Sequence, residues 1–538
     1  MNGGIFSAGQ WRGRLVAGLL LWAAPGRADN FTFSTNADNT ITLTAYNGEG
    51  GNVIVPSRVN ELPVVEIGPS AFMGCRTVTD IDLPGSMLRI GRNAFMACTN
   101  LPGMFIPAAV NSIGDGAFSW CSRMTAIDVD TNNANFESRN GVLFNEDGSV
   151  LICHPGGMAG SYVVPDGVVE LAPSAFVDCD EMPGIGIPNG ILCIGKFAFS
   201  GCDGLTNVLL PQSVTNVADG AFASCAQLAS ISVDSDNPAY EAADGALLAK
   251  GGGEFVQCPG SRVGTYAVPA TVTNIRASAF AGCEGLTNIW IPPSVIAMGA
   301  DPFASCYNLA AFEVDPSNPM YASMEGVLYF KDIHVLVRYP PGKSGPCVLP
   351  DSVADVADSA FSCCTELSHV SLGNAVTNIG ASAFVNCQNL NTVTLGSGVA
   401  RIGAFAFVAC PNLRELYIAG NAPSFDGSIY GTLTTTTVYR LSESTGWDAP
   451  SWYGYMMSHS ALWVPRISDD GLGLQSGRFG FQMNWAAGHA VVVEACTNLA
   501  APVWLALETN ELADGTGIFE DEEETTARGR FYRVVPAP

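Results

Sequence analysis

Basic side chains are scarce in this sequence. Lys and Arg together number 24 against 50 Asp and Glu, which gives a net charge of −26, and the only lysines are Lys196, Lys250, Lys331 and Lys343. A nucleic acid is held by clustered Lys and Arg on its phosphates, so this balance argues against a nucleic-acid partner. The same field repels an anionic membrane surface. We interpret the acids as dispersed, solubilising charge rather than as an acidic recognition surface.

Long hydrophobic runs are also missing. The apolar run from Leu15 to Ala24 follows Arg12 and Arg14 and precedes the small residues Gly26 and Ala28. Such a run is too short to span a bilayer and is typical of a cleaved export signal. We therefore predict a signal peptide over residues 1–28, no transmembrane segment, and a protein that is secreted or lies at the cell surface.

Signatures of catalysis are absent as well. The five histidines form no metal-binding spacing, and the sequence contains no Gly-x-Ser-x-Gly, phosphate-binding loop or dinucleotide fingerprint. The acidic segment that begins at Asp128 lacks the glycine and distal glutamate of a calcium loop, which favours a turn. His154 aligns with Cys258 and Tyr339 of related segments and is interpreted as structural. We predict no catalytic residue, no metal ligand and no cofactor, and therefore no enzyme.

Cysteine, in contrast, is abundant, and most cysteines are regularly spaced. Eleven of the 17 cysteines end an Ala-Phe-x-x-Cys signature, and successive copies lie 23 or 58 residues apart. A fixed period of about 20–50 residues indicates a solenoid of stacked coils. One copy reads Asp301-Pro302-Phe303, and the proline is expected to bend that corner. The signature cysteines are Cys75, Cys98, Cys121, Cys179, Cys202, Cys225, Cys283, Cys306, Cys364, Cys387 and Cys410.

Each 23-residue unit reads as a strand, a return leg and a corner. In one unit Val208 and Leu210 alternate as inward residues and Pro211 ends the strand. The Ala-Phe-x-x-Cys segment then makes a tight turn or a short helical corner. Stacked corners place the phenylalanines in a spine of Phe72, Phe95, Phe118, Phe176, Phe199, Phe222, Phe280, Phe303, Phe361, Phe384 and Phe407.

Stacking also decides what the signature cysteines do. Equivalent residues of neighbouring coils lie about 4.8 Å apart, with nearly parallel Cβ directions, which is poor geometry for a disulfide. We therefore predict buried free thiols that fill the interior. The redox state of five cysteines outside this row is left open: Cys153, Cys193, Cys258, Cys347 and Cys496.

The repeats resemble those of the bacterial surface protein A (BspA)-like leucine-rich repeat family. The resemblance rests on the eleven Ala-Phe-x-x-Cys units and on strands of the form Leu-x-x-h-x-h-Pro (h is apolar), over roughly Phe31 to Gly420. It implies an extended ribbon of coils used for adhesion or protein contact outside the cell. The tail segments VVVEACTNLAAPVW and RGRFYRV are similar to C-terminal modules of exported bacterial repeat proteins.

The expected fold is a mainly β leucine-rich-repeat solenoid followed by a small β-sandwich-like domain. The three 58-residue gaps carry Asn-Pro and Asn-Gly or Asp-Gly pairs, which predict an inserted hairpin in each long repeat. The predicted divisions are a signal peptide (1–28), an N-terminal β cap (29–69), the solenoid (70–420), a C-terminal cap (421–468), a linker (469–477) and a C-terminal β module (478–538).

The residue between the two inward residues of each strand points outward, and unexpected side chains stand there. We take Phe105, Leu209, Trp290, Glu313 and Tyr417 as candidate binding residues, because exposed aromatic and apolar groups mark contacts with proteins or sugars. Alternatively, the hairpins or the C-terminal module cover them.

The favoured function is a non-catalytic binding or adhesion surface for a protein or glycan. One alternative is a purely structural spacer or surface-layer component. The other is a glycan- or peptide-acting enzyme with its site in the C-terminal module.

Overall fold

The structure is a computed structural model that describes residues 30–345, 347–426, 436–448, 460–475, 478–496, 503–521 and 530–537. The chain divides into two compact units, the first ending at Glu146 and the second beginning at Asp147. The predicted signal peptide lies outside the described residues. Within the described ranges the chain forms strands and turns without an α-helix, so each Ala-Phe-x-x-Cys corner is a turn.

Each repeat forms one coil of a β-solenoid from two short strands. Leading strand β18 (Asn207–Leu210) buries Val208 and Leu210 and exposes Leu209. After Pro211 the chain comes back through return strand β19 (Asn216–Val217). Successive leading strands and successive return strands pair in parallel, so the apolar residues of both legs face one interior. The predicted leucine-rich-repeat solenoid is confirmed.

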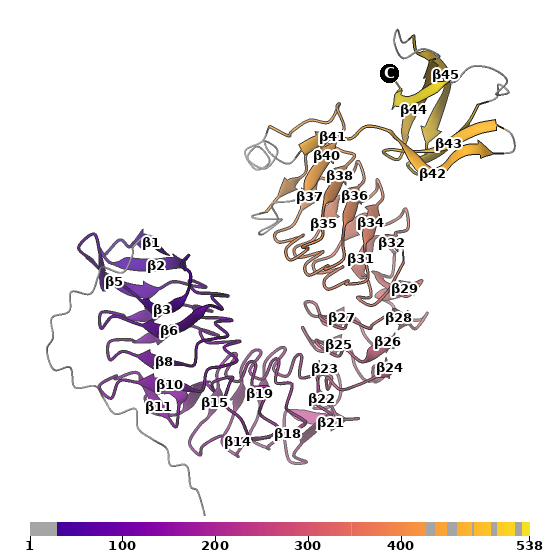
Figure 1. The fold of residues 1–538 in the computed structure, drawn as a ribbon. Helices are drawn as coiled ribbons and strands as arrows, with labels where there is room; N and C mark the ends of the chain where they lie inside the picture. Colours follow the sequence, from indigo (N-terminus) through magenta and orange to yellow (C-terminus); the bar gives the residue numbers. More distant parts are fainter. Residues whose placement is uncertain are drawn as a thin grey trace, which may run out of the picture. The chain divides into compact units, whose positions relative to one another are not determined.

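In the first unit the two legs build separate sheets, and Figure 1 shows its leading strands stacked one on another. The leading strands pair as β3 (Gly51–Ile54) with β6 (Val78–Asp82), and β8 (Gly103–Ile106) with β10 (Ala126–Val129). The return sheet has the order β1 (Phe31–Thr35), β2 (Ile41–Tyr46), β5 (Leu62–Ile67), β7 (Arg89–Ile90) and β9 (Ser112–Ile113), and β4 (Arg58–Val59) pairs with β5.

The leading strands of the second unit form four sheets. The first two sheets are β14 (Tyr162–Val163) with β16 (Ile185–Gly186), and β18 with β20 (Ser230–Val233). The third contains β24 (Gly264–Ala267), β26 (Leu286–Ile291) and β28 (Ala311–Val314). The fourth contains β32 (Cys347–Val348), β34 (His369–Leu372), β36 (Thr392–Leu395), β38 (Glu415–Ile418), β40 (Thr437–Arg440) and β41 (Ser460–Leu462).

The return strands of the second unit fall into three runs. The first run is β13 (Val150–Cys153), β15 (Glu170–Leu171), β17 (Cys193–Ile194) and β19. The second is β23 (Glu254–Gln257), β25 (Asn274–Ile275) and β27 (Ala297–Met298). The third is β31 (Val335–Arg338), β33 (Asp355–Val356), β35 (Asn378–Ile379), β37 (Arg401–Ile402) and β39 (Ser424–Phe425).

The corner phenylalanines stack ring on ring inside the coils. Consecutive ring centroids lie 4.6–5.8 Å apart, and the ring planes differ by at most 30°. Two residues of most corners have left-handed backbone, one before the alanine and one before the cysteine; Ser382 (φ 54°) and Asn386 (φ 61°) are an example. This conformation closes the turn tightly and lets corner N–H groups bond forward to the next coil, as Phe384 N does to Ala406 O at 2.8 Å.

The signature cysteine is a hydrogen-bond donor as well as interior filler. In seven coils its Sγ lies 2.9–3.2 Å from the carbonyl oxygen of the phenylalanine one coil earlier, as Cys410 does from Phe384. That oxygen also accepts the N–H of the cysteine in its own corner: Phe361 O, which accepts from Cys387 Sγ, accepts from Cys364 N at 3.2 Å. All 17 cysteines are free thiols. The thiol therefore supplies a second donor to a buried carbonyl that would otherwise be underused.

Each long repeat carries the expected antiparallel hairpin. The hairpins are β11 (Phe136–Arg139) with β12 (Val142–Asn145), β21 (Tyr240–Ala243) with β22 (Ala246–Ala249), and β29 (Tyr321–Met324) with β30 (Val327–Phe330). Just before each hairpin stands an asparagine, at 133, 237 or 318, that makes the same four hydrogen bonds each time. Asn237 Nδ2 donates to Pro211 O and Val214 O, and its Oδ1 accepts from the N–H groups of Ala239 and Tyr240, all within 2.8–2.9 Å. The asparagine thus ties the hairpin to the coil before it.

The corner at Pro302, which departs from the Ala-Phe-x-x-Cys signature, contacts a charged side chain, that of Arg338. Arg338 is 3% exposed, and its guanidinium lies 3.0 Å from Asp301 Oδ1. The guanidinium also donates to the carbonyl oxygens of Phe303, Ser359 and Ser362. Burial raises the pKa of Asp301 and the nearby Arg338 opposes that rise. The corner keeps its ladder bond, with Phe280 N donating to Pro302 O at 2.8 Å, so the proline does not interrupt the stack.

After Gly420 the signature stops but the sheets continue. Strand β39 extends the return sheet and β40 and β41 extend the leading sheet, so the described part of the predicted cap is further solenoid. The linker expected at 469–477 is a second difference, because residues up to Gln475 belong to strand β42 (Arg466–Gln475). The register shifts between Ser468 and Gly473, so the acidic, glycine-rich segment is accommodated as an irregularity in the strand rather than as a spacer.

The C-terminal module consists of two three-stranded antiparallel sheets. One has the order β42, β43 (Arg478–Asn484) and β46 (Thr516–Glu520), and the other β45 (Leu505–Leu512), β44 (His489–Cys496) and β47 (Phe531–Pro536). Their buried residues, among them Phe481, Met483 and Val491, form one apolar cluster. Ala419 and Leu441 from the end of the solenoid belong to the same cluster, so the module is packed onto the last coils.

We predict that Asn237→Ala lowers the free energy of unfolding by about 3 kcal/mol, because the change removes four hydrogen bonds in a site where Asn237 is 1% exposed. Chemical denaturation of the purified chain measures this loss. Asn135→Ala, at an exposed position before the first hairpin, is the control and is expected to change stability by less than about 0.5 kcal/mol. Equal small effects for both variants would contradict the tie.

We predict that the ten buried signature thiols resist a water-soluble alkylating reagent in the native protein, whereas half-buried Cys75 is more accessible. Burial raises the pKa of the Cys98, Cys202 and Cys306 thiols, and the thiolate is the reactive form. Half-buried Cys193 should react first. Mass spectrometry of peptides before and after denaturation measures the order of labelling. Rapid native labelling of Cys202, or a disulfide between neighbouring coils, would contradict it.

Candidate functional site

The five outward candidates lie on four different leading sheets. Phe105 stands opposite Asp128 in the first unit. In the second unit Leu209 stands opposite Ser232, and Trp290 opposite Glu313. Phe105 and Leu209 are 52% and 58% exposed, whereas Trp290 is half-buried. All five therefore stand at middle positions of leading strands, and of the four in the second unit Trp290 and Glu313 are neighbours in register.

Tyr417 differs from the other four because aromatic rings surround it. It stands between Thr394 and Tyr439 in register, and its ring centroid lies 4.5 Å from that of Tyr439 with nearly parallel planes. The ring of Trp463 lies 4.9 Å away on another side. Both neighbours come from the segment after Gly420, so the chain's own C-terminal part covers Tyr417 in part.

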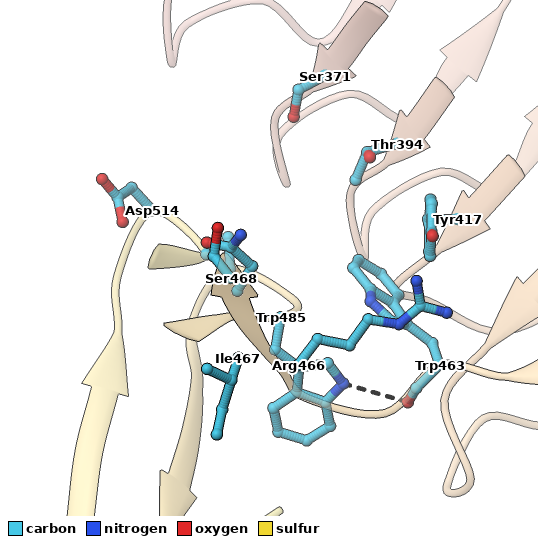
Figure 2. A pocket seen from close by; sticks show the side chains of 12 residues that line it. Ser371, Thr394, Tyr417, Trp463, Arg466, Ile467, Ser468, Trp485 and Asp514 are labelled. Atoms are coloured by element: carbon cyan, nitrogen blue, oxygen red, sulfur yellow. Dashed lines mark hydrogen bonds between the residues drawn. The ribbon is translucent and has the colours of Figure 1, made fainter. Parts of the chain in front are cut away.

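A pocket of about 430 Å³ opens beside Tyr417. Ser371, Thr394 and Tyr417, on the adjacent strands β34, β36 and β38, form a row on one side of it (Figure 2). The other sides come from Trp463, from the first residues of β42, and from two turns of the module. Those lining residues are Trp463, Arg466, Ile467, Ser468, Asn484, Trp485, Ala487, Asp514 and Gly515.

Trp485 fixes the module against the end of the solenoid. It is 8% exposed, and its Nε1 donates to the carbonyl oxygen of Trp463 at 3.1 Å, the dashed line in Figure 2. Its ring meets the His489 ring edge-on at 5.2 Å, and His489 Nε2 lies 3.5 Å from Glu443 Oε1 in the last coil. These contacts place the turn after β43 next to the strand face that carries Tyr417.

The pocket contains one cationic and one anionic side chain. The Arg466 guanidinium extends toward Tyr417 and Trp463 (Figure 2) and lies over the ring of Tyr439 at 5.5 Å. Asp514 Oδ1 accepts from the N–H and hydroxyl of Thr516 at 2.9 and 2.8 Å, and these bonds lower the pKa of the Asp514 carboxyl. Burial raises the pKa of Tyr417 to about 12, so its phenol stays protonated and can donate.

Several residues of this pocket could not be recognised in the sequence. Trp463 and Arg466 fall in the segment predicted to be a cap, and no motif marks Asn484 or Asp514. These residues meet only because the module docks on the last coils. The single local signal was Tyr417, an aromatic side chain at a position where the strand pattern expects an outward residue.

The other side chains considered as ligands serve the fold. His154 is 3% exposed, and its ring stacks on Phe176 at 5.1 Å while Nδ1 lies 3.3 Å from Cys179 Sγ. Asp130 Oδ1 accepts from the N–H and Nδ2 of Asn132, which is turn chemistry. In the part of the chain that the structure describes, no three His, Cys, Asp or Glu residues are grouped to hold a metal ion. None of the described residues forms a helix long and apolar enough to cross a membrane.

The coil length, the stacked corners and the parallel leading strands define a leucine-rich-repeat protein. A family model described as the BspA type leucine-rich repeat region matches six copies over residues 54–142, 160–241, 255–323 and 346–443, which is more than half of the chain. The chain belongs to this family of bacterial surface proteins.

Solved structures of three bacterial proteins are similar to this chain. A leucine-rich cell surface protein from Faecalibacterium prausnitzii is 24% identical over 74% of this chain and 94% of its own, with a TM-score of 0.36. A leucine-rich repeat protein from Bacteroides ovatus is 21% identical over 74% and 98%, with a TM-score of 0.27. The pneumococcal vaccine antigen PcpA is 15% identical over 80% and 95%, with a TM-score of 0.29. No curated protein matches the chain.

We predict that His154 makes stability fall in acid. Burial lowers the pKa of His154 to about 4 from an ordinary value of 6.5, because the folded interior disfavours the imidazolium. As the pH falls from about 7.5 to about 4, the unfolded chain therefore binds a proton that the folded chain does not, and the free energy of unfolding drops by about 3 kcal/mol.

His154→Tyr is the matched control, because Tyr339 fills the equivalent position and stacks on Phe361 at 5.2 Å. Chemical denaturation of both proteins across this pH range isolates the histidine, since other titrating groups cancel in the difference. A difference in stability that stays constant with pH would contradict the prediction.

Proposed function

We propose that the protein works outside the cytoplasm as a non-catalytic binding or adhesion surface for a protein or glycan partner, with the pocket beside Tyr417 as its main contact site. Membership of a family of bacterial surface proteins supports the location, as does the export-signal pattern over residues 1–28. Phe105, Leu209, Trp290 and Glu313 serve as secondary contacts along the same type of strand face.

The observation that carries the proposal is the chemistry of the pocket walls. Ligand sites combine apolar or aromatic walls with a few polar groups that fix orientation, and their volumes are about 300–1,000 Å³. The pocket beside Tyr417 has this composition, with aromatic rings from Tyr417 and Trp463 next to the side chains of Arg466, Asn484 and Asp514. Its floor continues the outward strand face, so a large partner can reach it.

The same walls favour binding over catalysis. Glycoside hydrolysis uses two carboxyl groups about 5–10 Å apart, and Asp514 is the single carboxylate among the lining residues. The lining residues also include no histidine or cysteine to act as a base or a nucleophile. What these groups provide is hydrogen bonding and aromatic contact.

We predict that Tyr417→Ala weakens partner binding by about 30-fold, as expected for an aromatic residue central to an interface. Trp290→Ala should have a smaller effect, because Trp290 lies outside the pocket. Pull-downs from host and neighbouring bacterial surfaces, followed by titration of the captured partner, measure both. Phe405→Ala, at a corner where the ring is 55% exposed, is the control.

Unchanged binding by Tyr417→Ala would remove the pocket from the proposal. A structural spacer predicts a different result, namely self-assembly of the purified chain without any partner. Sedimentation of the chain alone distinguishes that role.

A further inference from the structure

We propose that the pocket beside Tyr417 binds a neutral, linear oligosaccharide, with one sugar ring against Tyr417 and Trp463 and further units crossing β36 and β34. This inference rests on the proposed function and names the class of its ligand.

The aromatic groups suit the face of a pyranose ring. Such a ring presents axial C–H bonds on one side, and these lie favourably on the electron-rich face of an aromatic side chain. Tyr417 and Trp463 are both half-buried and line the pocket, and their planes are tilted by 52°. Tyr439 supports the other side of Tyr417 at 4.5 Å, so the platform is held in place before a ligand arrives.

The polar side chains of the pocket suit the hydroxyl groups of a sugar, because each hydroxyl donates one hydrogen bond and accepts others. Arg466 supplies donors, Asp514 supplies acceptors, and the Asn484 amide supplies both. The hydroxyls of Ser371 and Thr394 add two further groups that work in either direction.

A peptide fits this surface less well. A peptide strand is commonly held by the free edge of a sheet. Here β36 is paired on both sides, with β34 and with β38, so its backbone hydrogen-bonding groups are engaged in the parallel sheet. The face therefore offers side chains and no open edge.

Charge argues for a neutral sugar. One arginine and one aspartate line the pocket, and their charges offset each other. The chain as a whole carries −26, a field that opposes the approach of polyanions such as uronic acid polymers or sulfated glycans.

The spacing of the strands favours a linear chain over a single sugar. Ser371, Thr394 and Tyr417 are register partners on successive strands, which lie about 4.8 Å apart. This step is comparable to the length of one pyranose unit in an extended glycan. Each coil then presents one hydrogen-bonding side chain to each sugar, and affinity should rise with chain length until the ligand spans all three residues.

The test is calorimetric titration of the full-length chain with gluco-, xylo- and manno-oligosaccharides of increasing length, and with oligogalacturonate as the acidic probe. We expect at least one neutral series to bind, with affinity that increases with length. Trp463→Ala should weaken it about tenfold or more. Asn484→Ala, at an exposed position, should weaken it about threefold and keep the native unfolding temperature. Phe405→Ala, at an exposed corner residue that does not line the pocket, should bind as the parent does.

Three results would overturn the inference: no binding of any neutral series, preference for oligogalacturonate, or binding that Trp463→Ala and Asn484→Ala leave unchanged. The proposed function fails separately. If Tyr417→Ala and Trp463→Ala abolish capture of a protein partner while no oligosaccharide binds, the binding function stands and the sugar is wrong. If neither a protein partner nor an oligosaccharide binds, both the proposed binding function and the oligosaccharide inference fail.

Discussion

The bond that the corner thiol makes in seven coils to the phenylalanine carbonyl of the preceding coil is the contact on which the rest of the structure depends. A corner needs two left-handed residues to close, and its backbone then points a carbonyl inward where no water reaches it. The cysteine is small enough to lie under the aromatic stack and long enough to donate to that oxygen. Ring stacking and thiol donation then set the same coil-to-coil register, so the middle residues of successive leading strands stand in one row on the outer face of the sheet.

The inserted hairpins interrupt this regularity without breaking the interior. Each hairpin stands between two runs of return strands along the chain, and the asparagine before it makes four hydrogen bonds, as Asn318 does. The ring spine also adapts, because His154 and Tyr339 stack on the phenylalanines that follow them. The third long repeat adds the Arg338–Asp301 pair at the corner that contains proline. An ion pair this deeply buried requires the carbonyl partners that Arg338 has.

Much of the fold could be predicted from spacing, and the site mostly could not, for one physical reason. The solenoid follows from properties that can be read along the sequence: inward and outward alternation, proline at strand ends and a 23-residue period. Val208 and Leu210 can therefore be recognised as inward residues from the sequence alone. The Asn237 tie could not be recognised, because Asn-Pro reads as a turn and its bonds go to residues about 25 positions earlier. The segment after Asp469 was expected to be a linker because acidic and glycine-rich composition hides a strand that pairs only with β43. Arg466, Asn484 and Asp514 come together only through docking of the module.

The position of the pocket follows from how a solenoid must end. The last coil exposes apolar residues that have no further coil to cover them, and here Ala419 and Leu441 are covered by the cluster of the C-terminal module. Where a globular module packs against the end of a flat sheet, a concave junction forms between them. The side chains that line this junction come from both the sheet and the module. Tyr417 is the outward residue of β38, which borders the pocket, and Arg466 begins β42 on the side of the module. Covering the end of the solenoid is therefore sufficient to bring the aromatic side chains of the last coils next to the polar turns of the module. Substitution of a few of these side chains can then produce a binding site without altering the repeat.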